Sequence, residues 1–429
     1  MNLKTRFRSA AIRRFSSADE LERLRNKARA RRKKQNTPST VHYFHQVDDP
    51  YSHLAVQKLD ALKTRYNLKF EPHLVTKPEK KFQGDASHFD TWALRDAINV
   101  AHHYATDLSP ASTAPDSATV GWANHQLAPL LSSTEFAQTA IEVGTALWTT
   151  RQSDNSAKSQ AATSALANGN AMRTKLGHYQ GAMFYFEGEW FWGVDRIRLL
   201  ELRLADEGFD TQSGPLCVPE PTPEPFKPRA ASDIMLEYFP SLRSPYTAIG
   251  HQRVLDVVKE SGVSLKVRPV MPMLMRGIPA PQAKQRYIIT DAAREGRAHG
   301  SPMGRVVDPF GEPVKQAFAL YPGAEALGKG MEFVTAYLRA AWVDGSDITK
   351  ANVLQQVVER AGLNWQETRD ASEQHDWEAV LQTNLNALTA DNLWGVPSFR
   401  VSGGTGEQSY ACWGQDRIWR VASEIARRS

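Results

Sequence analysis

The sequence contains only two cysteines in 429 residues, and this scarcity excludes several kinds of site. Cys217 and Cys412 lie far apart, so neither a disulfide framework nor a zinc site built from four thiolates is available. No Cys-x-x-Cys motif occurs, which argues against a dithiol redox centre. We therefore expect the protein to work in a reducing compartment, and we predict a cytoplasmic location.

Long apolar segments are also missing. No run of apolar residues approaches the roughly 18 to 20 that a transmembrane helix needs, and the N-terminus lacks the apolar block of a secretory signal. A hydrophobic content of 41% with 23% charged residues is typical of a soluble globular protein. Because 429 residues exceed what one core usually supports, we expect two domains.

Acidic residues are scarce at the N-terminus. Residues 1–36 hold thirteen Lys and Arg against three acidic residues, a net charge of +10, so the chain total of +5 leaves −5 for the remainder. This basic tail is predicted to be helical or disordered. It is either a solvated extension or a contact for RNA or an acidic membrane surface. A third interpretation is a mitochondrial import presequence, because residues 1–17 are rich in Arg and Ser and free of acidic residues.

What the chain does contain is an internal repeat. Residues 43–52 and 238–247 share an order of aromatic residues, a loop, Pro, Tyr and a hydroxyl residue. Residues 191–197 match residues 412–418 around the dipeptide Trp-Gly and a following Asp-Arg. Matched landmarks at both ends of both halves predict a tandem duplication.

Each half opens as a βαβ unit, continues with a long helical middle and closes with a hairpin and a last helix. The predicted helical middles are residues 89–176 and 282–386. Between the halves, residues 214–228 hold six prolines, which predict a semi-rigid spacer. The predicted domains are therefore a tail (1–36), a first domain (40–205), a proline-rich linker (206–229) and a second domain (230–429). The expected fold class is α/β, with two thioredoxin-like domains that each carry an inserted helical subdomain.

The second copy of the repeat holds a candidate anion site. Ser244 precedes Pro245 at a predicted helix N-terminus, where unpaired backbone N–H groups and the helix dipole favour an anion. A thiolate or carboxylate beside this hydroxyl would be stabilised. The alternative is that Ser244 serves only as the N-cap of the helix.

Several motifs of the second half occur in the order known from one family. They are Ser244-Pro245-Tyr246 and the segments 341–348, 361–363, 394–399 and 413–417. Together they resemble the DsbA-type family that contains 2-hydroxychromene-2-carboxylate isomerase and the kappa-class glutathione transferases. The first half resembles the same family mainly at its two ends.

The resemblance implies a glutathione site at the junction of the thioredoxin fold and its helical insertion. It implies that Ser244 activates the glutathione thiol, that Val396 and Pro397 form a cis peptide whose backbone pairs with glutathione, and that Asp416, with Gln415 beside it, holds the γ-glutamyl end. The implied function is a glutathione-dependent isomerase or transferase acting on a small conjugated or aromatic substrate.

Two departures from the family pattern stand out. The Asn expected after the second strand has no counterpart in residues 271–281, where Arg276 is the nearest polar candidate, followed by Gln282. In the first half Asp49 replaces the Ser, and a carboxylate would repel a thiolate. Residues 40–205 are therefore interpreted as a degenerate copy with a structural or partner role, packed against the second half as a pseudo-dimer.

Two other functions remain open: a thiol–disulfide oxidoreductase-like protein without Cys-x-x-Cys, and a non-catalytic module that binds a peptide or protein along the Pro397 edge. No metal site is expected, because His42 and His45 are three apart on a predicted strand and point to opposite faces. Asp195 and Asp416 are each predicted to cap the helix that follows.

Overall fold

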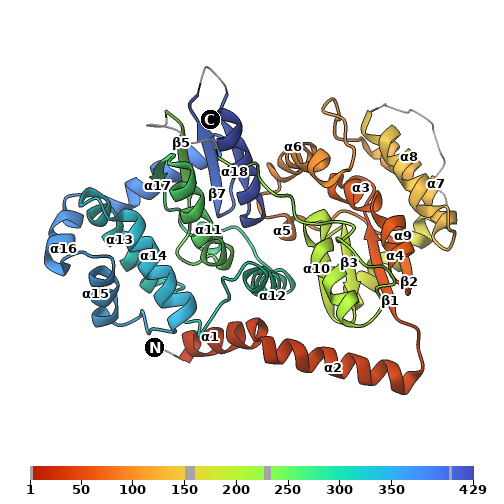
Figure 1. Cartoon of the computed structure of the whole chain (residues 1–429), viewed down its shortest axis with the longest axis horizontal. Coiled ribbons are helices and arrows are strands. Elements are labelled where there is room, and N and C mark those ends of the chain that lie inside the picture. Colours follow the sequence, from red (N-terminus) through yellow and green to blue (C-terminus); the bar gives the residue numbers. More distant parts are fainter. Residues whose placement is uncertain (1–2, 150–159, 227–232, 405–407) are drawn as a thin grey trace. The chain divides into compact units, whose positions relative to one another are not determined.

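The computed structural model describes residues 3–149, 160–226, 233–404 and 408–429 (Figure 1). Pro228 and the first residues of the predicted second domain lie outside the described residues. The chain divides into two compact units. The N-terminal unit comprises Glu22–Pro221 with Ala280–Tyr287, and the C-terminal unit comprises Thr222–Pro279 and Ile288–Ser429 with Met1–Leu21.

The N-terminal unit is built on a four-stranded sheet of order β2-β1-β3-β4. β1 (Thr40–His45) pairs in parallel with β2 (Lys69–Leu74), and the connection between them carries α3 (Pro50–Val56) and α4 (Leu59–Arg65). β3 (Met183–Phe186) pairs antiparallel with β1 and with β4 (Glu189–Trp192). The hairpin between β3 and β4 turns at Glu187 and Gly188, whose φ values of 46° and 98° are those that a tight two-residue turn requires.

The helix of the first predicted βαβ unit is divided into two, α3 and α4, in the structure. The break falls at Gln57, whose side-chain amide donates to Asp107 O at 2.8 Å and accepts from Asp107 N at 2.7 Å. This pair of hydrogen bonds fixes the end of α3 against a loop.

The C-terminal unit repeats the topology in a sheet of order β6-β5-β7-β8. β5 (Met235–Phe239) runs parallel to β6 (Ser264–Val267) and antiparallel to β7 (Ser398–Ser402), which pairs with β8 (Tyr410–Trp413). The chain is therefore α/β with two sheets of the same strand order and directions. Common ancestry of the two halves stays a prediction.

Helices fill the predicted middles of both halves. Those of the N-terminal unit are α5 (Lys80–Gln83), α6 (Phe89–Ala101), η1 (His102–Tyr104), α7 (Ser117–Leu127), η2 (Ala128–Leu130), α8 (Phe136–Thr149), α9 (Gln160–Lys175) and the closing α10 (Gly193–Asp206). Those that follow are α11 (Pro245–Ser261), η3 (Met273–Arg276), α12 (Gln282–Ala298), α13 (Glu312–Ala326), α14 (Gly330–Arg339), η4 (Ala340–Asp344), α15 (Ala351–Arg360), α16 (Trp365–Glu373), α17 (Trp377–Thr389), η5 (Gln415–Arg417) and α18 (Ile418–Arg428). No helix in the part of the chain that the structure describes is long and apolar enough to cross a membrane.

The core of the C-terminal unit joins the sheet to the helical insertion. Trp342 is buried and its indole N–H donates to Leu242 O at 3.2 Å, in the loop that leads to α11. Tyr238 stacks on Phe399 across β5 and β7 with ring centroids 5.5 Å apart. Because these contacts fix the C-terminal end of β5 and Leu242 after it, the loop between β5 and α11 is held in place.

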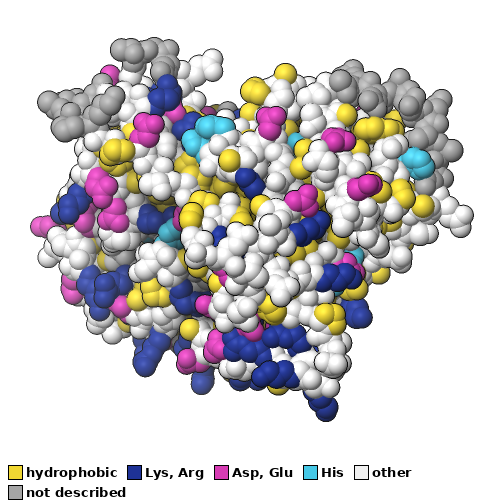
Figure 2. Space-filling model, turned by 45° about the vertical axis from the view of Figure 1, so that its right-hand side comes forward, with side chains coloured by type: hydrophobic (Ala, Val, Ile, Leu, Met, Phe, Trp, Pro, Cys, Tyr) yellow, Lys and Arg dark blue, Asp and Glu magenta, His cyan; other side chains and the backbone are white. Residues whose placement is uncertain are grey.

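The basic N-terminal residues form two helices, α1 (Leu3–Ser16) and α2 (Ala18–Gln35). Lys and Arg side chains gather at the bottom of the view in Figure 2, where α2 lies in Figure 1. Arg25 forms a two-point ion pair with Glu189, and Arg29 binds Glu207 at 2.6 Å. Part of the positive charge of α2 is therefore paired inside the N-terminal unit. Contact of residues 1–36 with nucleic acid or an acidic surface stays a prediction.

The first part of the predicted linker follows the N-terminal unit closely. Arg65 binds Asp210 through both carboxylate oxygens, at 3.0 and 2.9 Å. The backbone N–H groups of Cys217 and Val218 donate to the buried carboxylate of Glu201 at 2.7 and 2.8 Å. These contacts hold the chain up to about the unit boundary at Pro221.

Candidate functional site

Ser244 lies at the N-terminus of α11, as predicted. It is the N-cap residue, with φ −100° and ψ 121°, and its hydroxyl oxygen accepts from Thr247 N at 3.1 Å. Pro245 occupies the first helical position, where its missing N–H costs nothing. Only 8% of Ser244 is exposed. The sequence produces this geometry because a buried strand runs through a short loop into Ser-Pro.

The Val396-Pro397 peptide is cis and lies directly before β7. Ser244 Oγ donates to Val396 O at 3.3 Å, so the hydroxyl and the cis-peptide segment meet although they are 152 residues apart in sequence. Pro397 O accepts from Gly414 N at 2.9 Å, which joins the same segment to the end of β8. The structure therefore brings together three predicted parts of the site: Ser244, Val396 and Pro397.

Arg276, the candidate in place of the family's Asn, supports this segment from η3. Its guanidinium donates to Met271 O at 3.0 Å and to Trp394 O at 2.5 Å. Trp394 in turn packs on Trp413, with ring centroids 5.0 Å apart. In the structure Arg276 thus joins the segment after β6 to Trp394, which lies two residues before Val396 of the cis peptide.

Gln415 is 1% exposed, and both ends of its side chain bond within the unit. Its amide nitrogen donates to Glu295 Oε2 at 2.8 Å, and its carbonyl oxygen accepts from Arg253, which also binds Gln415 O at 2.9 Å. Gln415 can therefore affect ligand binding only indirectly, by fixing the position of its neighbour Asp416.

Asp416 lies in η5, one turn before the last helix, and is partly exposed. The prediction that it caps α18 was wrong, because α18 begins at Ile418 with Arg417 in the N-cap position. The same prediction for Asp195 was wrong, because α10 already begins at Gly193. Asp195 therefore lies inside the first turn of α10, whereas Asp416 lies in the short helix η5 that precedes α18.

A charged cluster not expected from the sequence borders the site. Asp308 is buried and binds Arg243, the neighbour of Ser244, at 2.8 Å, and also Arg8 of α1 at 2.7 Å. Both guanidinium groups lie over the ring of Phe310, at 4.7 and 5.0 Å from its centroid. The carboxylate of Asp308 thus holds Arg243, the residue before Ser244, and Arg8 of α1 binds the same carboxylate.

The corresponding place in the N-terminal unit is chemically different. Asp49 is the N-cap of α3 and accepts from Tyr51 N at 3.2 Å and from Ser52 Oγ at 3.0 Å. Burial raises the pKa of Asp49 to about 7, against the lowering effect of these hydrogen bonds. Ser52 Oγ also accepts from Ala182 N at 2.8 Å. The helix N-terminus and the strand edge opposite it are thus bound to each other.

Comparison with known proteins finds a family model that matches the C-terminal half of the chain. Residues 235–426 match the family model described as a DSBA-like thioredoxin domain. The matched part of the C-terminal unit is called the DSBA-like domain below. A search of curated proteins finds no match.

Solved structures resemble the chain at low sequence identity. A putative protein disulfide isomerase from Nitrosomonas europaea is 14% identical, with a TM-score of 0.37, over 45% of this chain and 97% of that one. The cytosolic disulfide reductase DsbM from Pseudomonas aeruginosa, solved with GSH, is 19% identical, with a TM-score of 0.33, over 46% and 100%. A 2-hydroxychromene-2-carboxylate isomerase is 20% identical, with a TM-score of 0.36, over 45% and 95%. At these identities and TM-scores the likeness carries no conclusion about the activity of this chain.

Several residues that hold the candidate site of the DSBA-like domain in place were not predicted from the sequence. Arg253 and Glu295 hold Gln415 from two different helices. One signal was present at Gly250 of α11, where an added Cβ would lie 3.0 Å from Gln415 Cβ. A glycine inside a helix often marks such a close approach.

Proposed function

We propose that the DSBA-like domain is a glutathione-dependent isomerase or transferase that acts on a small conjugated or aromatic substrate. The observation that carries the proposal is the 3.3 Å contact between Ser244 Oγ and Val396 O. It places a hydroxyl donor, a helix N-terminus and a carbonyl beside a cis-proline at one point. Those are the groups that an anionic sulfur attached to a peptide backbone requires.

In this proposal Val396 O accepts a backbone N–H of the ligand. That hydrogen bond competes with the Ser244 hydroxyl for the same carbonyl, so ligand binding frees the hydroxyl to turn. Ser244 Oγ can keep accepting from Thr247 N while its proton points to the sulfur. Bound glutathione would supply a thiolate, which a helix N-terminus and one hydroxyl donor stabilise.

Asp416 supplies the second anchor. Its carboxylate would accept from the ammonium group of the γ-glutamyl end, and a charge-assisted hydrogen bond of this kind is worth about 1.5 to 3 kcal/mol. Gln415, Arg253 and Glu295 act as positioning residues, because they fix the backbone next to Asp416.

A specific observation also favours a second function, a non-catalytic module that binds a peptide along the Pro397 edge. The Ser244 hydroxyl already accepts one hydrogen bond and donates another within the protein, as a helix cap does. An oxidoreductase is less favoured, since Cys412 is 2% exposed on β8 and serine stands at the helix N-terminus. Reduction of insulin by the purified protein would instead favour the oxidoreductase function.

The experiment is calorimetric titration of glutathione into the full-length chain and two matched variants. Asp416→Asn removes the charge of the proposed anchor, whereas Asp195→Asn makes the same change at the corresponding turn of the N-terminal unit. We expect binding by the wild-type chain, a loss of roughly 10- to 100-fold in affinity for Asp416→Asn, and no change for Asp195→Asn.

Two results would contradict the proposal. If the wild-type chain does not bind glutathione, the family's cofactor has been lost and the peptide-binding function becomes the better candidate. If Asp416→Asn binds as tightly as wild type, the γ-glutamyl anchor lies elsewhere.

A further inference from the structure

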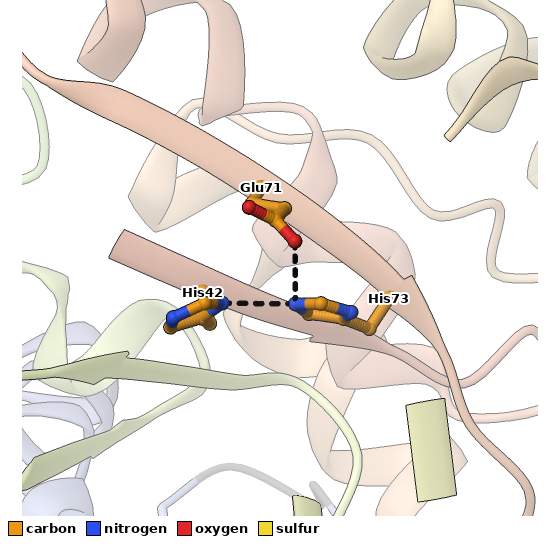
Figure 3. Close-up of side chains that lie close together, drawn as sticks. All are labelled: His42, Glu71 and His73. Atoms are coloured by element: carbon orange, nitrogen blue, oxygen red, sulfur yellow. Dashed lines mark hydrogen bonds and ion pairs between the residues drawn. The ribbon is translucent and has the colours of Figure 1, made fainter. Parts of the chain in front are cut away.

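Three potential metal ligands gather on one face of the N-terminal sheet, outside the site described above. His42 comes from β1, and Glu71 and His73 come from the neighbouring β2 (Figure 3). The parallel register sets His42 opposite Glu71. Because Glu71 and His73 are two residues apart on a strand, their side chains lie on the same face as His42.

The ligand atoms of these side chains lie close together. His42 Nδ1 is 3.0 Å from His73 Nε2, and Glu71 Oε1 is 3.8 Å from that same nitrogen. All three ligand atoms lie within 4.8 Å of one another. Figure 3 shows the two imidazole rings directing nitrogen atoms at each other, with the carboxylate of Glu71 above His73. This is the only such group of three His, Cys, Asp or Glu residues among the residues that the structure describes.

We propose that His42, Glu71 and His73 bind a divalent cation of the zinc type. Zinc is bound by imidazole nitrogen at about 2.0 to 2.1 Å and by carboxylate oxygen at similar distances, which sets tetrahedral ligands roughly 3.3 Å apart. The two observed separations, 3.0 and 3.8 Å, bracket that value. Two imidazoles and one carboxylate form a known zinc ligand set that leaves a position for water.

The surroundings hold the rings in place and leave the site accessible. Phe44 stacks on His73 with ring centroids 4.9 Å apart, and Tyr185 lies beside His42 at 6.1 Å. The side chains of His73 and Glu71 are 12% and 34% exposed, so water can complete the coordination. Without a cation, the two neutral imidazoles can share only one proton between the facing nitrogens.

One neighbouring charge opposes the cation. Lys69 Nζ lies 2.8 Å from Glu71 Oε2, on the oxygen that faces away from His73. The Lys69 side chain is 60% exposed and is free to swing into solvent. Replacing this lysine by a neutral residue should therefore tighten cation binding, because it removes a competitor for the carboxylate.

The test is calorimetric titration of Zn²⁺ into the full-length chain after treatment with a chelator, together with the visible absorption of the Co²⁺-loaded chain. We expect one Zn²⁺ per chain at this site. The variants His73→Gln and Glu71→Gln should each weaken binding by at least the roughly 10- to 100-fold that loss of a supporting contact costs. Lys69→Gln should strengthen it.

The matched control is the double variant His102→Ala and His103→Ala, which removes another pair of adjacent imidazoles, with ring centroids 3.7 Å apart and no carboxylate in the group. Zinc affinity should be unchanged in this control. Unchanged Zn²⁺ affinity in both His73→Gln and Glu71→Gln, or no binding by the wild-type chain, would overturn the proposal. Glu71→Gln keeps the test decisive if a histidine variant fails to fold, because Glu71 is partly exposed.

Discussion

In both units the first strand of the sheet runs into a helix that begins with proline, but the residue before that proline is Asp49 in one unit and Ser244 in the other. The surrounding frame is the same. Three hydrogen bonds of the N-terminal unit have a counterpart in the C-terminal unit. Gln46 N to Ser52 Oγ at 3.2 Å corresponds to Ser241 N to Thr247 Oγ1 at 3.3 Å, and Gly193 N to Ala182 O at 2.8 Å corresponds to Gly414 N to Pro397 O at 2.9 Å. Tyr51 OH to Asp96 at 2.5 Å corresponds to Tyr246 OH to Asp291 at 2.8 Å.

The difference lies in what the frame presents to a ligand. In the N-terminal unit, Ala182 N donates to Ser52, and Asp195 accepts from Tyr104 OH at 2.8 Å. In the C-terminal unit the residue in the position of Ala182 is Pro397, which has no N–H to tie to the helix. One scaffold can therefore close or open its site by changing a few side chains at the helix N-terminus and at the strand edge opposite it.

The largest effect is expected at Asp49. Its pKa is raised to about 7 in the folded state by burial, so the native chain holds a proton that the unfolded chain loses near pH 4. Stability from this group is therefore full below about pH 4 and falls as the pH rises toward 7, by on the order of 3 to 4 kcal/mol. Asp49→Asn should remove that loss. The measurement is guanidinium unfolding of both chains at pH 4.5 and 7.5.

The Asp49→Asn chain should gain stability relative to wild type at pH 7.5 and not at pH 4.5. Equal differences at both pH values would mean that Asp49 stays ionised in the folded chain. Asp49 would then present a full negative charge at its helix N-terminus, where Ser244 presents a neutral hydroxyl.

A smaller effect is expected from adding a methyl group to the closed site of the N-terminal unit, where Ala182 N is hydrogen-bonded to Ser52. An added Cβ at Gly181, the counterpart of Val396, would lie 2.6 Å from Gln46 Cβ and 3.1 Å from Asp49 Oδ2. Gln46 is only 4% exposed and has little room to move. We expect Gly181→Ala to destabilise the chain by about 1 to 3 kcal/mol, measured by denaturant unfolding.

Gly121 on α7 is the control, because no atom outside its own stretch of helix lies within 4 Å of an added Cβ there. Gly121→Ala should stabilise the chain by about 0.5 to 1 kcal/mol, since alanine favours a helix interior. If Gly181→Ala behaves like Gly121→Ala, the closed site has space, and the two units differ less than the contacts indicate.

Much of this arrangement could be predicted from the sequence because it depends on local order. A strand that runs into Ser-Pro predicts the N-cap at Ser244, and the repeat of that pattern predicts two sheets with the same strand order. The hairpin at Glu187-Gly188 follows from a turn that needs positive φ at both residues.

Contacts between distant residues could not be predicted in the same way. Strand alternation correctly separated His42 from His45, but it says nothing about the register that brings His73 beside His42 from the next strand. The shared carboxylate of Asp308 likewise joins α1 to the Ser244 loop across about 300 residues of sequence. A single sequence carries no signal for such pairings, because either partner would also be acceptable on a solvated surface.

The smallest effect concerns the two roles of Ser244. Loss of its cap to Thr247 N in Ser244→Ala should lower the stability of the chain by about 1 kcal/mol. Asn364 caps α16 by accepting from Gln366 N and Glu367 N, so Asn364→Ala should lower stability by a similar amount, about 1 kcal/mol. The two variants differ in chemistry, because only Ser244 also reaches Val396 O.

Turnover of a glutathione-dependent test substrate should therefore fall roughly tenfold or more in Ser244→Ala, the scale of losing one donor to a developing anion, and stay unchanged in Asn364→Ala. Ser244→Thr keeps the hydroxyl and should restore most of both properties. Equal turnover in the Ser244→Ala and Asn364→Ala chains would reduce Ser244 to a cap. The open site would then differ from the closed one only in its shape, and binding along the Pro397 edge would be the function left to test.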